Sequence, residues 1–571
     1  MEQRSGQSSR AATELQLAYG VFQGGGARGF AHIGALRAAE ELGFRFYGFA
    51  GTSAGAVVAA LASVGYKADE IFDTANPTKH LLARVAAERS DWQYRSPIDV
   101  LGHKDWKGFH QLRSAVHKCS DKRDWRRPLH FSKLIPGLVS GYRRLNRQRG
   151  WFQTAEIVKV VNELLYDQLT RNYSAYERAS GQRLPKTFGK LIRFCDVSRS
   201  VPNCTTLKII ATDLARNRLV VFSSHDTPDV SIAQAVAASA AVPFVFEPVH
   251  VRWPDGDEGR IYVDGGLASN LPIWAFRDEK AADERRLGGR LPTLGFAFQE
   301  NDVRQHARQW NFSLRELSGR VTTAGLSTGQ SVVRDFIEDL EMIALPCDLS
   351  MFDFDADLGK ICRAVDTAHK FTKDRLTFRF VTRPKKVKYL LEKLQKNALA
   401  RFESDGLPRT AMRLAAIEPV RTRYRRARPL HFRVAETYGF NGDADDRLLL
   451  DGSNRAAPRA FALKGPTVWP PEDASTEPYV FLDSEPMTKY ERALVRRGLR
   501  SILSLPVFAD PSEWAKPTTD RSDAIGVVTI DSDQDCRNLF RTQTFLDFVV
   551  PQTGGLTEIF LRSEDGKLWE D

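Results

Sequence analysis

Two glycine-rich stretches near the N-terminus carry residue types that acyl-transfer chemistry needs. Residues 24–29 read Gly-Gly-Gly-Ala-Arg-Gly, and residues 51–55 read Gly-Thr-Ser-Ala-Gly. The second stretch places Ser53 in the Gly-x-Ser-x-Gly pattern of a nucleophile elbow, where a sharp turn holds a serine hydroxyl clear of a sheet. Gly51 and Gly55 remove side chains that would crowd this turn. The pattern predicts that Ser53 attacks a carbonyl carbon.

The first stretch offers hydrogen-bond donors for the negative charge that such an attack creates. Successive glycines at a helix N-terminus expose backbone N–H groups at the positive end of the helix dipole. We therefore expect Gly24, Gly25, Gly26 and Arg28 to stabilise the oxyanion.

Two other interpretations of these stretches stay open at this point. The glycine spacing in 24–29 also fits a dinucleotide-binding turn, although the strand expected at 44–50 ends without the acidic residue that would hold a ribose. The stretch 51–55, taken alone, also fits an ordinary tight turn.

A nucleophilic serine needs a general base. The chain has 11 histidines, and we considered His32, His225 and His250, but none lies in an obvious strand-end motif. Asp264 lies in a clearer motif, because it follows the apolar run 261–263 and precedes two glycines. Ligand chemistry collects at strand ends in α/β sheets. Asp-Gly is also a common turn signal, so a simple capping role for Asp264 remains the alternative.

The three motifs, in this order along the chain, resemble those of the patatin-like phospholipases. The resemblance implies a three-layer α/β/α catalytic domain with a Ser–Asp dyad and no histidine. It assigns Ser53 as the nucleophile, Asp264 as the dyad aspartate, and the 24–28 loop as the oxyanion loop. The segments 210–223 and 231–243 resemble further family elements. In the second of these, Ser231 and Gln234 predict a capped helix that ends before Pro243.

Length and composition indicate an ordinary globular protein with several domains. The chain has 571 residues, 42% of them hydrophobic and 27% charged, and a formal net charge of +11. This charge favours anionic surfaces, either phospholipid or nucleic acid. Six scattered cysteines predict neither a disulfide framework nor a zinc site. We expect a cytoplasmic protein with peripheral membrane association, because no signal-peptide core or membrane-spanning run is present.

The order of these features predicts the domain organisation. A polar tail at 1–17 precedes the patatin-like domain at 18–380, which is expected to contain a long helix at 151–182 and strands near 207–211, 219–223, 261–264 and 293–298. Residues 301–380 look mainly helical and polar. Arginines, lysines and aromatic residues alternate through 84–150. This insertion fits a lipid-facing lid, a nucleic-acid-binding surface or a solvated helical insertion, and the sequence does not choose among them.

A second domain is expected at the C-terminus, after a helical connector at 381–420. Residues 421–565 resemble a GAF domain, which implies an α+β fold. The strands are expected at 431–438, 459–463, 501–508, 524–531 and 556–561. The resemblance implies either a sensor of small molecules, often nucleotides, or a dimerisation module. We therefore expect either a nucleotide-like ligand or a homodimer contact here.

One segment near the C-terminus resembles the start of a calcium-binding loop, with aspartates at 531, 533 and 535. That loop requires glycine at its sixth position and glutamate at its twelfth, where this chain has Cys536 and Thr542. The sequence predicts no metal and no cofactor.

Three functions follow as hypotheses. The first is a serine acyl hydrolase that cleaves phospholipid at the membrane surface. The second is a membrane-damaging lipase effector, as in some bacterial defence systems, gated by a ligand at the GAF-like domain. The third, of a different class, is a basic protein with inert motifs that binds nucleic acid; this partner is the least favoured.

Overall fold

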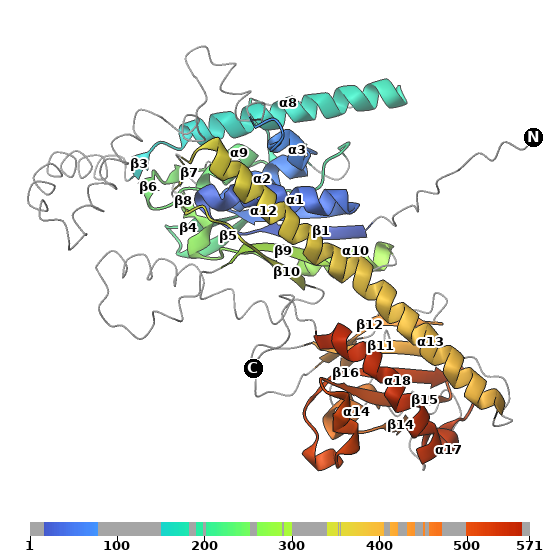
Figure 1. Cartoon of the computed structure of the whole chain (residues 1–571). Helices are drawn as coiled ribbons and strands as arrows, with labels where there is room; N and C mark the ends of the chain where they lie inside the picture. The colour runs from blue at the N-terminus through green and yellow to red at the C-terminus, as the bar shows by residue number, and fades with distance from the viewer. Residues whose placement is uncertain are drawn as a thin grey trace, which may run out of the picture. The chain divides into compact units, whose positions relative to one another are not determined.

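The chain divides into two compact units, with the boundary between Asp374 and Arg375 (Figure 1). The basic insertion, except Gly150, and residues 1–15 lie outside the described residues. The computed structural model describes residues 16–77, 81, 150–181, 190–197, 201–251, 260–287, 291–299, 340–351, 353–354, 356–404, 412–420, 431–439, 449–451, 456–470 and 498–561.

The first unit is built on an eight-stranded mixed sheet with the order β10-β9-β1-β2-β4-β8-β7, in which β5 also pairs with β4. Strands β10, β9, β1, β2 and β4 run parallel, whereas β5 and β8 run antiparallel to β4. The strands are β1 (Gln16–Phe22), β2 (Phe44–Thr52), β4 (Thr206–Asp213), β5 (Arg218–Ser223), β7 (Val249–His250), β8 (Ile261–Asp264), β9 (Thr293–Phe298) and β10 (Leu340–Leu345).

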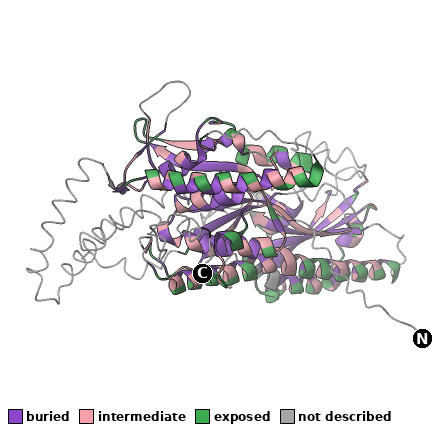
Figure 2. Ribbon diagram, turned by 90° about the horizontal axis from the view of Figure 1, so that it is seen from above, coloured by how far each residue is buried: buried purple, intermediate pink, exposed green. Residues whose placement is uncertain are grey.

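Helices cover both faces of this sheet. Phe22 contacts His32 of α1 (Phe30–Glu41) on one face, where α2 (Ala54–Ser63) and α9 (Ile232–Ser239) also pack. Tyr19 points to the other face, where it stacks on Phe276 and donates to Asp283 of α10 (Arg277–Leu287). Alternation along β1 explains this division. The three-layer α/β/α expectation is confirmed, and Figure 2 shows the buried residues concentrated in the strands, with exposed residues along the outer helices.

Most of the expected elements of this unit are present. The strands predicted near 207, 219, 261 and 293 are β4, β5, β8 and β9, and the predicted long helix is α8 (Ala155–Ser180). A short parallel pair, β3 (Gly150–Phe152) with β6 (Phe244–Phe246), lies beside the main sheet. The expectation that residues 301–380 are mainly helical is wrong at β10, which adds an edge strand and buries alternate side chains. Residues 300–339 lie outside the described residues.

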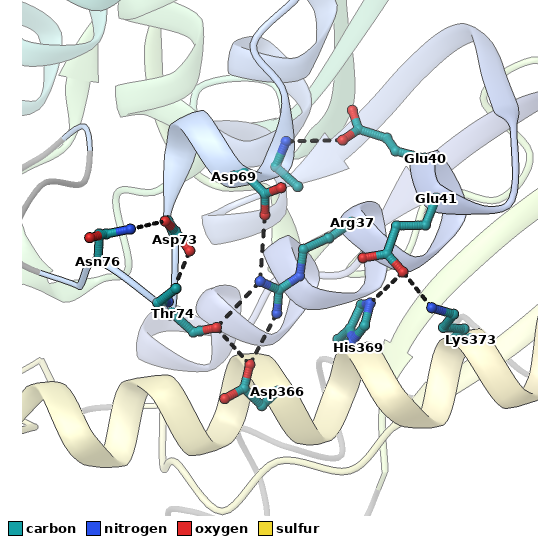
Figure 3. Close-up of polar contacts among 12 residues, drawn as sticks. Arg37, Glu40, Glu41, Asp69, Asp73, Thr74, Asn76, Asp366, His369 and Lys373 are labelled. Carbon is teal, nitrogen blue, oxygen red and sulfur yellow. Dashed lines mark hydrogen bonds and ion pairs between the residues drawn. The ribbon is translucent and has the colours of Figure 1, made fainter.

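Helix α12 (Leu358–Leu376) contacts α1 through several polar side chains (Figure 3). Arg37 of α1 pairs with Asp366 at 3.0 Å, and Glu41 pairs with Lys373 at 2.7 Å. The two helices approach closely at Gly34, where an added Cβ would lie 2.0 Å from the Val365 carbonyl oxygen. Since α1 follows directly on the glycine loop, α12 supports the element that carries that loop.

The second unit contains a six-stranded antiparallel sheet with the order β13-β12-β11-β16-β15-β14. Helices α13 (Arg383–Ser404) and α18 (Gln543–Leu561) bury apolar residues against one face. Helix α14 (Ala456–Leu463) packs on the other. The strands are β11 (Met412–Val420), β12 (His431–Tyr438), β13 (Leu449–Asp451), β14 (Thr467–Trp469), β15 (Ser501–Phe508) and β16 (Ala524–Ser532).

Three expectations for this unit need correction. Residues 459–463 belong to α14 and residues 556–561 to α18, so neither is a strand. Leu556 and Phe560 are buried four positions apart, which is a helical spacing. The range 381–420 is more than a connector, because it contains α13 and a central strand, β11. The strands expected at 431, 501 and 524 are present, and the GAF-like assignment remains a prediction.

None of the helices in the described part of the chain is long and apolar enough to cross a bilayer.

Candidate active site

Ser53 occupies a strained turn between β2 and α2. Its backbone has φ 54° and ψ −123°, a region that non-glycine residues rarely adopt, and its side chain is buried. A Cβ on Gly51 would lie 2.3 Å from the Gly55 carbonyl oxygen, and one on Gly55 would lie 2.4 Å from the Phe22 carbonyl oxygen. Only glycine therefore fits at either side of the turn, and this is the geometry that a nucleophile elbow requires.

Strand β4 brings Asp264 to the same place. Thr52, which precedes the nucleophile, pairs with Ile210 of β4, and Asp264 pairs with the next residue, Ala211, on the same edge, because β5 occupies the other edge of β4. Since β2 runs parallel and β8 antiparallel to β4, neighbouring partners on one edge of β4 make the last residues of β2 and β8 meet end to end. Ser53 and Asp264, far apart in the sequence, are thus brought together by strand register.

The carboxyl of Asp264 is buried and only half satisfied. Its Oδ1 accepts from the Gly266 N–H at 2.7 Å, while its Oδ2 makes no hydrogen bond of regular geometry with any described residue. Burial raises the pKa of Asp264 to about 6, and hydrogen bonding from the Ser53 hydroxyl and the Gly266 N–H opposes this increase. The contact with Ser53 is loose, as catalytic hydrogen bonds often are before substrate binds.

The glycine loop is fixed at its first peptide group. His32 Nε2 donates to the Gln23 carbonyl oxygen at 2.8 Å, and the Gly24 N–H donates to the Asn270 carbonyl oxygen at 3.0 Å. Gly24 is therefore not available as an oxyanion donor in this state. The N–H groups of Gly25 and Gly26 have no acceptor among the described residues, so these two are the candidate donors.

This loop lies directly against the nucleophile. An added Cβ on Gly24 would come within 3.1 Å of the Ser53 Cβ, and one on Gly29 within 2.8 Å of the Ala54 Cβ. Gly26 has φ +57°, and a Cβ there would lie 2.2 Å from the Met351 carbonyl oxygen. The loop continues into a single 3₁₀ turn, Gly26–Gly29, which packs on the start of α2.

Arg28 supports the shape of the loop. Its guanidinium lies over the Phe298 ring, 4.6 Å from the centroid, and its Nε donates to the Gly25 carbonyl oxygen at 3.5 Å. These contacts favour an indirect role for Arg28, through the peptide that carries a candidate donor. Its direct role in stabilising the oxyanion stays a prediction.

The segment after Asp264 connects all three motifs, and the sequence reasoning gave its residues no role. The Ser269 carbonyl accepts from Thr52 Oγ1 at 2.9 Å, and the Asn270 carbonyl accepts from Gly24. The only signal for these positions in the sequence was their place in the stretch that follows Asp-Gly-Gly.

The histidines considered as bases differ from Asp264. Burial lowers the pKa of His32 to about 4, so its ring is neutral, and its Nε2 serves the Gln23 carbonyl. His225 is 90% exposed and pairs with Asp226. His250 is exposed on β7. Within the described residues, no group of three or more His, Cys, Asp or Glu side chains is arranged to hold a metal ion.

Comparisons with known proteins match this region of the chain. Residues 20–277 match the family model described as Patatin-like phospholipase. The uncharacterized protein YqhO of Bacillus subtilis (strain 168) is 30% identical over 267 residues, which span 46% of this chain and 67% of that protein. An uncharacterized protein of Acanthamoeba polyphaga mimivirus is 25% identical over 220 residues, 36% of this chain and 69% of that protein.

Two solved structures are also similar. VipD from Legionella pneumophila gives a TM-score of 0.30 at 16% identity and covers 69% of this chain and 77% of its own. ExoU, in the heterodimeric complex with SpcU from the type III secretion system of Pseudomonas aeruginosa, gives a TM-score of 0.30 at 18% identity, with coverage of 63% and 51%.

Proposed function

The chain belongs to the patatin-like phospholipase family and carries its lipid acyl hydrolase domain, and from this premise we propose that it cleaves fatty-acyl esters of membrane phospholipids through a Ser53–Asp264 dyad. The observation that carries the proposal is the register of β4, which holds Thr52 and Asp264 at neighbouring positions. The Oδ2 of Asp264, which has no regular hydrogen bond with a described residue, and the glycine loop packed against Ser53 support it further.

The first half-reaction transfers the acyl group to the enzyme. Asp264 removes the proton from Ser53 Oγ as that oxygen attacks the ester carbonyl carbon. The oxyanion that forms accepts hydrogen bonds from the N–H groups of Gly25 and Gly26, near the positive end of the α2 dipole. The intermediate then collapses, the bond to the alcohol oxygen breaks, and protonated Asp264 returns its proton to that leaving group.

The second half-reaction releases the fatty acid. Asp264 takes a proton from water as the water oxygen attacks the acyl-Ser53 carbonyl, and the same donors stabilise the second oxyanion. Collapse breaks the bond to Ser53 Oγ, which recovers its proton from Asp264. A positioned base typically contributes ~10²–10⁴-fold and one oxyanion donor ~10²–10³-fold to the rate.

Mixed liposomes provide the test, with the full chain and mass spectrometry of the released lipids. We expect Ser53→Ala and Asp264→Asn each to remove nearly all fatty-acid release while the fold is retained. Ser63→Ala is the matched control, because this buried serine lies at the far end of α2 and donates within its own helix. Unchanged release by either folded dyad variant would refute the assignment.

The membrane surface is the proposed partner of this reaction. The net charge of +11 favours binding to vesicles that contain anionic lipid over purely zwitterionic ones. Binding of this kind weakens as salt increases.

We also propose that the second unit regulates the lipase by binding a nucleotide-like small molecule or by forming a homodimer. Its separate antiparallel sheet, covered by helices on both faces, supports an independent α+β module. Thermal-shift screening of the full chain against nucleotides, with size measurement in solution, tests both. No shift with any nucleotide and a monomeric chain with full lipase activity would contradict this regulatory role.

A further inference from the structure

The C-terminal end of α9 contacts both members of the proposed dyad. Ser239, the last residue of α9, is fully buried, and its Oγ accepts from the Ser53 backbone N–H at 2.8 Å. The same hydroxyl donates to the Ile210 carbonyl oxygen at 2.5 Å. Two residues later, the Ala241 carbonyl accepts from the Asp264 backbone N–H at 2.9 Å. One short stretch therefore holds the backbone of the nucleophile and of the base.

The Ser239 hydroxyl takes the place of a missing hydrogen bond in the sheet. With Thr52 paired to Ile210 in parallel register, the next bond of the ladder would join the Ser53 N–H to the Ile210 carbonyl. The elbow turns the chain away at Ser53, so these two groups no longer pair directly. Ser239 lies between them and satisfies both, which is why a strained residue can be kept at the end of β2 without an orphaned N–H group.

A comparison with Ser63 shows that this arrangement is specific. Serine hydroxyls inside helices commonly bond to a carbonyl of the preceding turn of the same helix. Ser63 of α2 makes a hydrogen bond of this kind, since its hydroxyl donates to the Ala60 carbonyl oxygen at 2.8 Å. Ser239 is equally buried in a neighbouring helix, but both of its hydrogen bonds leave the helix, one for Ser53 at the end of β2 and one for Ile210 within β4.

The base is packed against the same point. An added Cβ on Gly265, directly after Asp264, would lie 2.1 Å from the Ile210 carbonyl oxygen. The oxygen that accepts from Ser239 is thus in close contact with the turn that carries the base. A displacement of Ser239 would change the position of Ser53 relative to Asp264.

We propose that Ser239 is a positioning residue, which fixes the Ser53 elbow relative to the Asp264 turn through its two hydrogen bonds. The inference rests on the proposed function of Ser53 and Asp264. Ser239 acts through the Ser53 backbone and touches no reacting atom, so its loss changes the turnover of bound substrate more than the binding of substrate.

The test compares four full-length variants with the wild type: Ser239→Ala, Ser239→Thr, Ser63→Ala and Ser53→Ala. Four quantities are measured on each, namely kcat and KM on a soluble p-nitrophenyl ester, the rate at which a fluorophosphonate probe labels the protein, and the melting temperature. For Ser239→Ala we expect kcat and the labelling rate to fall about 10–100-fold, with KM within about twofold. Ser239→Thr keeps the hydroxyl and should recover most of kcat.

Ser63→Ala controls for the general cost of removing a buried serine hydroxyl. It should lower the melting temperature but leave kcat and labelling unchanged. A folded Ser239→Ala protein with kcat within twofold of wild type would overturn the proposal. If Ser239→Ala is not recovered folded, Ser239→Cys replaces it with the same expectation, and failure of both to fold would show a purely structural role and likewise overturn it.

The Ser53→Ala variant distinguishes failure of the proposed function from failure of the positioning role. Ester turnover that persists in Ser53→Ala refutes the proposed function itself. Turnover that is lost in Ser53→Ala but unchanged in folded Ser239→Ala refutes only the positioning role.

Discussion

Asp264 and Asp213 are both buried aspartates at strand ends of the same sheet, but their carboxyls are satisfied differently. Asp213 accepts from the backbone N–H groups of Ala215 and Arg216 through Oδ1 and from the Arg216 guanidinium through Oδ2. Among the described residues, the Asp264 carboxyl has one regular hydrogen bond, through Oδ1. An acceptor left free on a buried carboxylate is what a general base needs, whereas Asp213 is a satisfied cap of a turn.

This difference predicts a pH dependence for the reaction. Asp264 must be ionised to accept a proton, and its pKa is raised to about 6 by burial. We therefore expect kcat/KM on a soluble ester to be constant above pH 7 and to fall about tenfold per pH unit well below pH 6. Circular dichroism at each pH shows whether the chain is still folded. Full activity at pH 4.5 would contradict the assignment of Asp264 as the base.

Ionisation of the Asp264 carboxyl, which the reaction requires, is also expected to lower the stability of the folded chain. A pKa raised from 3.8 to about 6 means that the folded state prefers the protonated form of Asp264, so the contribution of this group to stability is fully present below pH 3.8 and is lost as pH rises through 6. Asp264→Asn removes this loss. We expect the variant to gain about 2–3 kcal/mol at pH 8 and little at pH 4, measured by denaturant unfolding.

Asp213→Asn is the matched control for that measurement. Its Oδ1 can still accept from the backbone N–H groups of Ala215 and Arg216, but its amide nitrogen would then face the Arg216 guanidinium, so this variant should be destabilised at pH 8. Equal destabilisation of both variants would show that Asp264 is a structural cap.

At the scale of elements, the site is the meeting point of three chain reversals: the β1–α1 glycine loop, the β2–α2 elbow and the turn after β8. Each reversal needs glycine because backbone from another element comes too close for a side chain. Hydrogen bonds between the reversals, from Thr52 to Ser269 and from Gly24 to Asn270, then lock them together. The β1–α1 loop is also held from outside, since the Ala27 N–H donates to the Met351 carbonyl.

A comparison of two glycines with similar φ angles distinguishes the effect of backbone strain from the effect of close packing around the loop. Gly26 has φ +57° and no room for a Cβ, while Gly181, at the end of α8, has φ +68° and nothing within 4 Å. We expect Gly181→Ala to cost about 1 kcal/mol and leave activity unchanged. Gly26→Ala should displace the loop and lower kcat at least tenfold, as measured on the same ester. Equal activities would mean that the loop does not carry the oxyanion donors.

At the scale of the whole molecule, each unit has its own hydrophobic core. Tyr19, Ile273 and Phe276 belong to one core on the main sheet of the first unit. In the second unit, α13 and α18 pack on one face of the antiparallel sheet and α14 on the other. Separate cores favour separate cooperative unfolding.

Calorimetry of the full chain can test this division. We expect two transitions, one for each unit. Leu503→Ala, at a fully buried position of β15, should lower only one of them by an amount equivalent to about 2–5 kcal/mol and leave ester hydrolysis unchanged below that transition. Leu165→Ala in α8 should move the other. A single transition shifted by both variants would refute independent units.

The sequence alone determined the local features of this site. Glycine spacing predicted the loop and the elbow, because only glycine tolerates such close backbone contacts, and the apolar runs predicted β4, β8 and β9. Periodicity was less reliable for short apolar segments, so residues 459–463 and 556–561 were predicted as strands although tertiary packing makes them helical.

The tertiary structure decided which of these local features act together. The register of β2 and β8 along one edge of β4 places Ser53 beside Asp264, and no local pattern encodes a pairing between residues so distant in the chain. It also decided that the Gly24 N–H donates to the Asn270 carbonyl oxygen, and that the Ser239 hydroxyl accepts from the Ser53 backbone N–H. The physical reason is that hydrogen-bond satisfaction and burial depend on neighbours in space, whereas the sequence specifies directly only neighbours along the chain.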